Sequence, residues 1–474
     1  MNILSFFQNI SFWIYRILSI ILINSYKLIY NTFSGINIPP AIIDSLPLYF
    51  LLGFLAIILI IFIYIKIAYP FWSTQPVYHT YDFWVSYYRT PYIIQNSYPS
   101  RTLFCKFDRI KTIDYLDLSD IQKKEIVNLI QSYSIPEETA IHMFHLGNLD
   151  SYMTGHSEKS LVSLYYEDTF IPLPKTLVNN PLVTDTTLID IIQKPIGCIC
   201  SRTVDIWISD KKIVAYYFDF ITVNREKLDI SRYLIQTHEY NQRRLSLDEA
   251  FSIRKGIKDN PNKNQSTDNK DAIQISIFKK ESGNSPGIVP LVSYESGMWY
   301  ILNERIRRLP PHFILVPIHR RNIQLLIDFL EKVRNKYTIF GIPELTNLSE
   351  LIHTGILKVY IIQKGQEIYS AYFFRDSRTE YEEKGALLIL CGSIKNTNSA
   401  DLFYMGFLRA LRDILKNNPI FKIIMIESIS NKLIYEKYKS ENNEFLGENP
   451  SGYYLYNYIY PGQPFQSESC FLVF

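Results

Sequence analysis

The sequence has few cysteines and almost no excess of one charge. Its five cysteines form no CxxC pair, and Cys198 and Cys200 alternate as on one face of a strand. Free thiols in a reducing compartment are therefore expected rather than a structural zinc site. The formal net charge is +3 over 474 residues, which is too small to indicate nucleic-acid binding. The sequence also lacks Walker A, GxSxG and HExxH motifs, so no motif indicates nucleotide, ester or peptide hydrolysis.

Charged residues are also missing from one stretch near the N-terminus. Residues 45–65 contain no charged side chain and are dominated by Leu, Ile and Phe. A helix of this length would measure about 31 Å, roughly the thickness of the hydrocarbon core of a bilayer. A core helix of a soluble protein would normally have a polar face, and this segment has none. We therefore predict a transmembrane helix.

A second hydrophobic segment, residues 5–30, is interrupted by Arg16 and Lys27. It could be a second membrane span or an amphipathic helix lying in the interface. No cleavage site of small residues follows a basic start, so a cleaved signal peptide is not expected. Residues 1–68 are therefore predicted to form a membrane anchor.

The remaining sequence mixes strand and helix patterns. The order strand–strand–helix–strand occurs twice, without sequence identity between the copies. The first copy comprises residues 195–199, 213–223, 228–244 and 273–278, and the second comprises residues 368–374, 386–394, 400–415 and 421–427. Residues 255–271 are almost entirely polar. They cannot offset the entropy of ordering by burial, so they are predicted to be a flexible insertion.

Several blocks resemble the N-myristoyltransferase family, whose members transfer myristate from its CoA thioester to an N-terminal glycine amine. Residues 71–77 match the family pattern Phe-Trp-x-Thr-Gln-Pro-Val. Residues 195–223 resemble the strand pair that ends in Asn-Phe-Leu-Cys-Val, and residues 452–457 resemble the Tyr-Tyr-Leu-Tyr-Asn block. The resemblance implies an α/β (α+β) fold in which two GNAT-type halves share a saddle-shaped mixed sheet. Residues 69–300 would form the acyl-CoA half and residues 301–474 the peptide half.

Acyl transfer from a thioester to an amine needs donors for the carbonyl oxygen and a base for the ammonium group. In the family, the donors are backbone N–H groups at a strand bulge, and the matching positions are Phe220 and Ile221. A β-bulge can free such groups from the sheet ladder. Without the resemblance, both would be ordinary strand residues. Asp219 stands where the family has Asn, and its carboxylate could accept a hydrogen bond from the ammonium group.

The resemblance implies that the base is the terminal carboxylate of Phe474. An α-carboxylate has a pKa of about 3.5 and an α-ammonium of about 8, so this base must be held close to the amine and away from water. The tail from Cys470 to Phe474 is apolar, which suits burial of the chain end. The tail could also be a strand that closes the sheet, and both interpretations can hold together.

The resemblance also assigns residues to acyl-CoA, whose phosphates would lie at a loop and a helix start. The assigned residues are Phe71, Trp72, Thr74, Gln75, Val223, Arg225, Lys227, Ser231 and Arg232. Glu226 and Asp229 depart from the family pattern and would repel phosphate. Each basic residue taken alone is also compatible with ordinary solvated surface charge.

The block near the C-terminus is assigned to the acceptor peptide. Tyr453, Tyr454, Tyr456 and Asn457 match the segment that shapes the peptide and acyl clefts of the family, although tyrosines in such a block also suit the core of a sheet. Phe278 stands where the family has a Thr that positions the amine. A lone histidine such as His238 is more often a packing residue than a catalyst.

The sequence therefore predicts a membrane-anchored transferase that moves a long acyl chain, myristoyl, onto the N-terminal glycine of proteins. Its soluble part would face the cytoplasm, where acyl-CoA and nascent chains are found. Acyl-CoA would be a co-substrate, and neither a permanently bound cofactor, a metal nor a nucleic-acid partner is expected. Two alternatives stay open: a relative that has lost catalysis and has a binding or structural role, and an N-acyltransferase for another amine.

Overall fold

The structure is a computed structural model that describes most of the chain. The described residues are 40–82, 85, 90–133, 140–172, 189–209, 211–259, 272–281, 283, 287–301, 308–382, 384–442 and 444–474. The chain divides into two compact units, Met1–Thr74 and Gln75–Phe474. The hydrophobic segment 5–30 and residues 260–271 of the predicted insertion lie outside the described residues.

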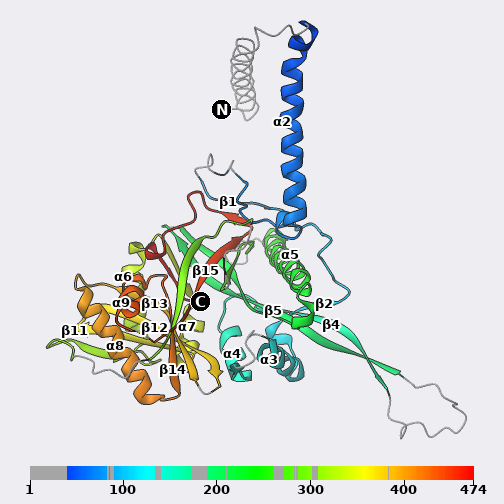
Figure 1. Cartoon of the computed structure of the whole chain (residues 1–474). Helices are drawn as coiled ribbons and strands as arrows, with labels where there is room; N and C mark the ends of the chain where they lie inside the picture. Colours follow the sequence, from blue (N-terminus) through cyan, green and yellow to red (C-terminus); the bar gives the residue numbers. More distant parts are fainter. Residues whose placement is uncertain are drawn as a thin grey trace, which may run out of the picture. The chain divides into compact units, whose positions relative to one another are not determined.

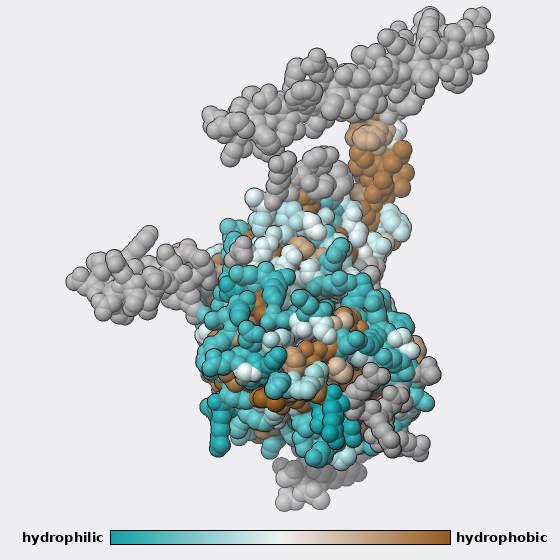
Figure 2. Space-filling view, turned by 90° about the vertical axis from the view of Figure 1, so that its left-hand side faces the viewer, coloured by the Kyte–Doolittle hydropathy of each residue, from teal (hydrophilic) through white to brown (hydrophobic). Residues whose placement is uncertain are grey.

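The first unit contains the long helix α2, Pro40–Ala68, followed by the short 3-10 helix η1, Trp72–Thr74 (Figure 1). Its segment Leu51–Ala68 is long and apolar enough to cross a membrane, and none of it is buried. Figure 2 shows these side chains as a brown, hydrophobic column. The predicted span, residues 45–65, lies within α2. The helix ends just before Tyr69 and Pro70, because the residue before a proline is disfavoured in helical conformation.

The second unit is built on one large mixed sheet. Its elements up to residue 300 are β1 (Tyr92–Ile93), β2 (Ile110–Asp114), η3 (Tyr115–Asp117), α3 (Asp120–Tyr133), β3 (Ala140–His142), α4 (Leu146–Met153), β4 (Leu161–Pro172), β5 (Ile189–Ile208), β6 (Lys211–Val223), η5 (Arg225–Lys227), α5 (Ile230–Asp259), β7 (Ser276–Lys280) and β8 (Val292–Tyr300).

The strands after residue 300 continue the same sheet, except β16, which pairs with β1 in a separate two-stranded sheet. The elements of this part are β9 (Ile314–Pro317), α6 (Ile323–Val333), η6 (Arg334–Lys336), β10 (Ile339–Pro343), α7 (Leu345–His353), β11 (Leu357–Lys364), β12 (Glu367–Tyr381), β13 (Gly385–Lys395), α8 (Ala400–Asn417), β14 (Phe421–Glu427), α9 (Lys432–Glu441), β15 (Phe445–Tyr456), β16 (Tyr458–Ile459), η7 (Ser467–Ser469) and β17 (Cys470–Leu472).

The strand order in the large sheet is β17-β10-β5-β6-β7-β15-β8-β14-β13-β12-β11-β9, with β4 also pairing β5 and β2, and β3 pairing β12. The predicted repeat is present as β5-β6-α5-β7 and β12-β13-α8-β14. In each copy the first two strands are antiparallel, and the strand after the helix runs parallel to the strand before it. Parallel neighbours need such a helical crossover. The predicted mixed α/β fold is confirmed, while the boundary between residues 300 and 301 stays a prediction.

Three apolar clusters form the core of the second unit. The first takes side chains from α3, α4, α6 and α7, and the second from α8 and α9. The third joins strands of both halves to the end of the chain. Phe471 and Val473 enter the first cluster, whereas Leu472 and Phe474 enter the third, because alternate residues of an extended chain point to opposite faces. The C-terminus therefore lies inside the unit, as Figure 1 shows.

The helix α5 is longer than predicted. The sequence pattern indicated a helix over residues 228–244 and a flexible insertion from residue 255, but α5 continues to Asp259. Residues 255–259 of the insertion are therefore helical. Lys and Asp do not prevent a helix from continuing once it is nucleated, since propagation adds one hydrogen bond for each residue that is fixed.

Gly341 of β10 allows the C-terminal residues to approach the sheet closely. A Cβ atom at this position would lie 2.5 Å from the Phe474 ring and 2.6 Å from Leu472 Cδ2. We expect Gly341→Ala to lower the free energy of unfolding by roughly 1–3 kcal/mol, because overpacking a dense core forces strain. Urea unfolding of the purified protein measures the change. Gly447→Ala is the matched control, because nothing lies within 4 Å of its Cβ position, and an equal effect of both substitutions would contradict this explanation.

Candidate active site

The strand β6 contains a β-bulge at the two residues that the sequence analysis proposed as oxyanion donors. Cys198 of β5 pairs with Thr222 and Cys200 pairs with Asp219, so Ile199 alone lies opposite Phe220 and Ile221. Such a two-against-one arrangement defines a bulge. The bulge is therefore present where it was predicted, and the catalytic role of its amides stays a prediction.

Phe220 has an unusual backbone conformation that its side chain holds in place. Its φ is 48°, in the left-handed region that non-glycine residues rarely occupy. Its ring packs against Phe144 at 5.0 Å and against Tyr152 at 5.3 Å between ring centroids. The side chain of Ile221, in contrast, is 39% exposed. A strained residue that packing holds in this way is a common feature of functional sites.

The carboxylate of Asp219 engages one of the proposed donors. The Phe220 N–H donates to Asp219 Oδ1 at 3.1 Å, and Arg202 Nε donates to Asp219 Oδ2 at 3.2 Å. The Phe220 amide is therefore already hydrogen-bonded in this structure, and an acyl carbonyl would have to displace the carboxylate to use it. The sequence analysis treated Asp219 as a partner for the incoming amine and did not foresee this contact.

Arg202 is the central residue of the site, and the sequence analysis missed it. Its side chain is fully buried, and its guanidinium lies between the rings of Tyr152 and Tyr217, at 5.3 and 5.4 Å. Two aromatic faces and a carboxylate partner offset the cost of burying a charge. A signal existed in the sequence, since an arginine inside the apolar strand 195–208 needs a buried partner.

The chain end lies close to the same tyrosines. Phe474 is 1% exposed, and its ring centroid lies 5.2 Å from that of Tyr217 and 5.9 Å from that of Tyr453. β17 pairs in parallel with β10, so the tail closes one edge of the sheet and is also buried. A series of ring and cation–π contacts therefore runs from Phe220 through Tyr152, Arg202 and Tyr217 to Phe474.

The three tyrosines assigned to the peptide lie on two faces of the sheet. Tyr453 lies beside Phe474, whereas Tyr454 stacks on Phe278 at 5.2 Å. The Tyr456 hydroxyl donates to Gln75 Oε1. Consecutive residues of a strand point to opposite faces, so Tyr453 is the tyrosine of this block that the structure brings to Phe474.

Asn457 fixes loops rather than facing Phe474. Its Nδ2 donates to the carbonyl oxygens of Gln95 at 3.1 Å and Gln274 at 3.0 Å, and its Oδ1 accepts from the Gln95 N–H at 2.8 Å. Its backbone N–H donates to the Pro76 carbonyl at 2.6 Å. Asn457 therefore joins three segments of the second unit.

Two of the three basic residues assigned to the CoA phosphates, Lys227 and Arg232, are engaged in ion pairs. Lys227 pairs with Glu167, and Arg232 pairs with Asp229 at 3.5 Å. All four side chains are well exposed to solvent, so these pairs contribute little to stability and can exchange. The sequence analysis noted Asp229 as a departure that would repel phosphate, and its carboxylate is indeed next to Arg232.

The rest of the proposed acyl-CoA loop forms local hydrogen bonds. Val223 is buried at the end of β6, and the 3-10 helix η5 carries Arg225 in the next turn. Glu226 donates its N–H to the side chain of Asn224 at 3.0 Å. The Ser231 hydroxyl donates to the Leu228 carbonyl at 2.7 Å. Whether these residues contact acyl-CoA stays a prediction.

The first four residues of the proposed family motif form a compact turn in the first unit. The rings of Phe71 and Trp72 meet edge to face at 5.0 Å. The Thr74 hydroxyl donates to the Phe71 carbonyl at 2.7 Å. Their proposed contact with acyl-CoA also stays a prediction.

A second group of charged side chains near Tyr453 was missed as well. Lys279 Nζ lies 2.7 Å from Glu427 Oε1 and 2.6 Å from Glu281 Oε1. Glu427 is buried, and the ring of Tyr294 stacks on that of Tyr453 at 5.9 Å. Glu427 ends the predicted strand 421–427, which was the available signal, because a buried charge at a strand end requires a partner.

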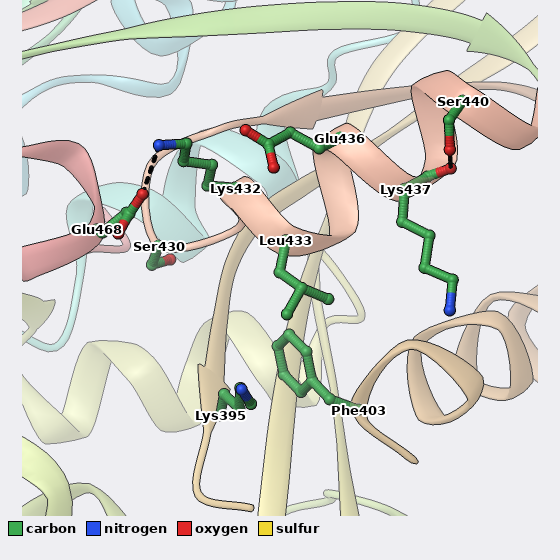
Figure 3. A pocket seen from close by; sticks show the side chains of 9 residues that line it. All are labelled: Lys395, Phe403, Ser430, Lys432, Leu433, Glu436, Lys437, Ser440 and Glu468. Carbon is green, nitrogen blue, oxygen red and sulfur yellow. Dashed lines mark hydrogen bonds and ion pairs between the residues drawn. The ribbon is translucent and has the colours of Figure 1, made fainter. Parts of the chain in front are cut away.

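A surface pocket of about 650 Å³ lies elsewhere in the second half (Figure 3). It is lined by Lys395, Phe403, Ser430, Lys432, Leu433, Glu436, Lys437, Ser440 and Glu468. Lys432 pairs with Glu468 at 2.6 Å and Lys437 with Asp401 at 2.9 Å. The lining of this pocket includes no residue of the bulge or of the C-terminal tail, so the pocket is separate from the candidate site.

His238 is a buried packing residue. Its Nδ1 lies 2.8 Å from Ser163 Oγ, and its ring meets that of Phe218 at 5.6 Å. Burial lowers the pKa of the His238 imidazole to about 3, so the ring is neutral near neutral pH. This agrees with the sequence analysis, which favoured packing over catalysis.

The buried imidazole makes stability depend on pH. Because the folded-state pKa lies below the unfolded value of about 6.5, the unfolded chain binds the proton first, and stability is lost as the pH falls through that value. We expect wild type to lose about 2 kcal/mol more than His238→Asn between about pH 7 and pH 5. Urea unfolding at several pH values measures this. His319→Asn, at an exposed position, is the control, and parallel curves for wild type and His238→Asn would contradict the assignment.

The fold of the chain was compared with those of known proteins. No protein-family model and no curated protein matches the sequence. A crystal structure of Saccharomyces cerevisiae N-myristoyltransferase with bound myristoyl-CoA matches with a TM-score of 0.59 and 9% identity, over 86% of this chain and 99% of that chain. A second structure of the Saccharomyces cerevisiae enzyme, also with bound myristoyl-CoA, matches with a TM-score of 0.56 and 11% identity, over 82% of this chain and 87% of that chain. A third structure of that enzyme, with bound myristoyl-CoA and inhibitors, matches with a TM-score of 0.57 and 10% identity, over 84% of this chain and 91% of that chain. The chain therefore has an N-myristoyltransferase-like fold.

Proposed function

We propose that this chain transfers a long acyl chain, myristoyl, from acyl-CoA to the N-terminal glycine amine of proteins. The observation that carries the proposal is the series of contacts between the bulge at Phe220 and the buried chain end at Phe474. These are the two parts that acyl transfer to an amine needs, and they are separated by most of the soluble sequence. The likeness in fold to a myristoyl-CoA-binding transferase supports the choice of acyl donor.

In the proposed mechanism, the carboxylate of Phe474 takes a proton from the ammonium group of the acceptor. The free amine attacks the thioester carbonyl, a C–N bond forms, and the C–S bond breaks to release CoA as the thiolate, which takes up a proton. The amides of Phe220 and Ile221 donate to the carbonyl oxygen as it becomes negative. Asp219 releases the Phe220 N–H and keeps its bond to Arg202, which holds the carboxylate near the reacting centre.

The proposal includes a membrane anchor. α2 would insert its segment Leu51–Ala68 into lipid, with the second unit in the cytoplasm, where acyl-CoA is made available. Anchoring would keep the enzyme at the surface to which its acylated products bind. Acyl-CoA would be a co-substrate, and Arg225, Lys227, Ser231 and Arg232 would bind its phosphates after exchanging their local partners.

A second candidate function is that of a fold relative without turnover. It is favoured by the Phe220 N–H, which already donates to Asp219, and by the ion pairs of Lys227 and Arg232. An assay with labelled acyl-CoA of several chain lengths and peptides with an N-terminal glycine separates the two. Turnover with any acyl chain supports the first function, and binding without turnover supports the second.

Extension of the chain beyond Phe474 tests the base. One added glycine would move the carboxylate by about 3.8 Å. We expect transfer to fall at least roughly 100-fold, the usual contribution of a general base, while acyl-CoA affinity measured by calorimetry is unchanged. Phe474→Leu keeps a terminal carboxylate and is the control, with a much smaller loss. Full activity of the extended chain would remove Phe474 from the mechanism.

Asp219→Asn tests whether the carboxylate competes with the oxyanion. An amide accepts a hydrogen bond less strongly than a carboxylate and carries no charge near the developing oxyanion. We expect kcat to rise roughly 5- to 10-fold, together with a loss of stability, because the buried guanidinium of Arg202 then keeps only a neutral acceptor at this position. Asp205→Asn, which removes a carboxylate that pairs with Lys212 on the same strand pair, is the control. A fall in kcat would instead assign Asp219 to binding of the amine.

A further inference from the structure

Arg375 is a charged residue of β12 that the proposed mechanism does not use. It pairs with Leu357 of β11 and with Ile389 of β13. Residues two apart on a strand share a face, so its side chain leaves β12 on the same side as Phe373. The Phe373 ring lies 5.3 Å from that of Phe471. Arg375 therefore points to the side of β12 on which the C-terminal tail lies.

The surroundings of Arg375 are those of the candidate site. The groups that act most on its charge, after burial, are the side chains of Tyr152, Cys391, Tyr217 and Tyr453, and together they keep the pKa of the Arg375 guanidinium raised. Three of these residues are the tyrosines that contact Phe220, Arg202 or Phe474. Arg375 thus faces the contact series that joins the bulge to the chain end.

Arg375 differs from the other two cations of this region in its pairing. Arg202 pairs with Asp219, and Lys279 pairs with Glu281 and Glu427. No hydrogen bond or ion pair joins the Arg375 guanidinium to any residue in the described part of the chain. The residue is only partly buried, and a guanidinium carries five N–H donors that a ligand could use.

A neutral donor, for which the described part of the chain offers no partner, stacks on Tyr453. The hydroxyl of Tyr294 is buried and has no hydrogen-bond partner among the described residues, and its ring stacks on that of Tyr453 at 5.9 Å. Leaving a buried hydroxyl unsatisfied costs free energy that a bound polar ligand recovers. Two donors for which no partner is recorded, the Tyr294 hydroxyl and the Arg375 guanidinium, therefore lie in the region of Tyr453, which contacts Phe474.

We propose that Arg375 binds a carboxylate of the acceptor, so that the acceptor is a primary amine with a carboxylate a few bonds from its nitrogen. The inference rests on the proposed function, because the amine must reach Phe474 while the carboxylate reaches Arg375. A planar guanidinium binds a carboxylate through two parallel hydrogen bonds. An acceptor without this group would leave the cation unpaired beside a second positive charge, the ammonium group. The carboxylate belongs either to a free amino acid or to an acidic side chain near a peptide N-terminus.

The experiment measures binding of matched acceptors to the full-length protein loaded with a non-reactive thioether analogue of myristoyl-CoA. One pair is glycine and glycinamide, and the other is a Gly-Glu-Ala and a Gly-Gln-Ala peptide, both amidated. By calorimetry we expect the carboxylate member of one pair to bind roughly 10- to 100-fold more tightly, the strength of a charge-assisted hydrogen-bond pair. A preference within the first pair indicates an amino acid, and a preference within the second indicates a protein.

Three variants decide whether Arg375 is responsible. Arg375→Gln should abolish the preference and Arg375→Lys should keep part of it. Arg378→Gln, which removes a charge that pairs with Asp376 on the same strand, should keep all of it. The inference would be overturned if wild type showed no preference in either pair. It would also be overturned if Arg375→Gln weakened binding of both members of each pair equally, because Arg375 would then support Phe474 or the fold rather than bind a carboxylate. A parallel transfer assay reports on the proposed function separately, since carboxylate-dependent binding without turnover would contradict only that function.

Discussion

The guanidinium of Arg202 is a charge placed where water does not reach it, and the candidate site is arranged around it. Burying such a charge costs several kcal/mol unless partners replace its hydration. Here the partners are the carboxylate of Asp219 and the faces of Tyr152 and Tyr217. Because Asp219 directly precedes the bulge, the same ion pair fixes the strand where Phe220 takes its left-handed conformation. The residue before the bulge and two of the tyrosines therefore contact the same buried cation.

The end of the chain reaches this region because two strands lack side chains where it passes. Gly341 of β10 faces Leu472 and Phe474, and Gly392 of β13 faces Val473 and Phe471. A Cβ atom at either position would lie closer to these side chains than packed atoms allow. The tail thus lies between strands from distant parts of the sheet. Its alternate side chains fill two apolar clusters, and this places the terminal residue beside Tyr217.

Among the described residues of this region, Arg202 and Lys279 have carboxylate partners, whereas no ion pair is recorded for Arg375. The pairs of Lys227 and Arg232 are exposed and can exchange for phosphate at small cost. The contact between Asp219 and the Phe220 amide is partly buried and more costly to break. Arg375, with no pair, suggests a ligand that carries a negative charge.

Local patterns in the sequence were sufficient for the features that depend on neighbouring residues. The uncharged run of α2, the two strand–strand–helix–strand units and the apolar tail all follow from periodicity and composition. The location of the bulge came from the resemblance of residues 195–223 to a family. The start of the predicted insertion was wrong because a helix, once packed, can extend into polar sequence.

The pairings across the sheet were decided only by the tertiary structure. Lys279 and Glu427 are 148 positions apart, and no local pattern indicates which of many charged residues will meet. The same holds for Arg202 between two tyrosines, for the tail beside β13, and for the unpaired guanidinium of Arg375. The sequence determined by itself which segments are apolar, helical or extended, because these properties arise from adjacent residues. The fold decided which charges meet or remain alone, because burial and pairing depend on residues that only the folded chain brings together.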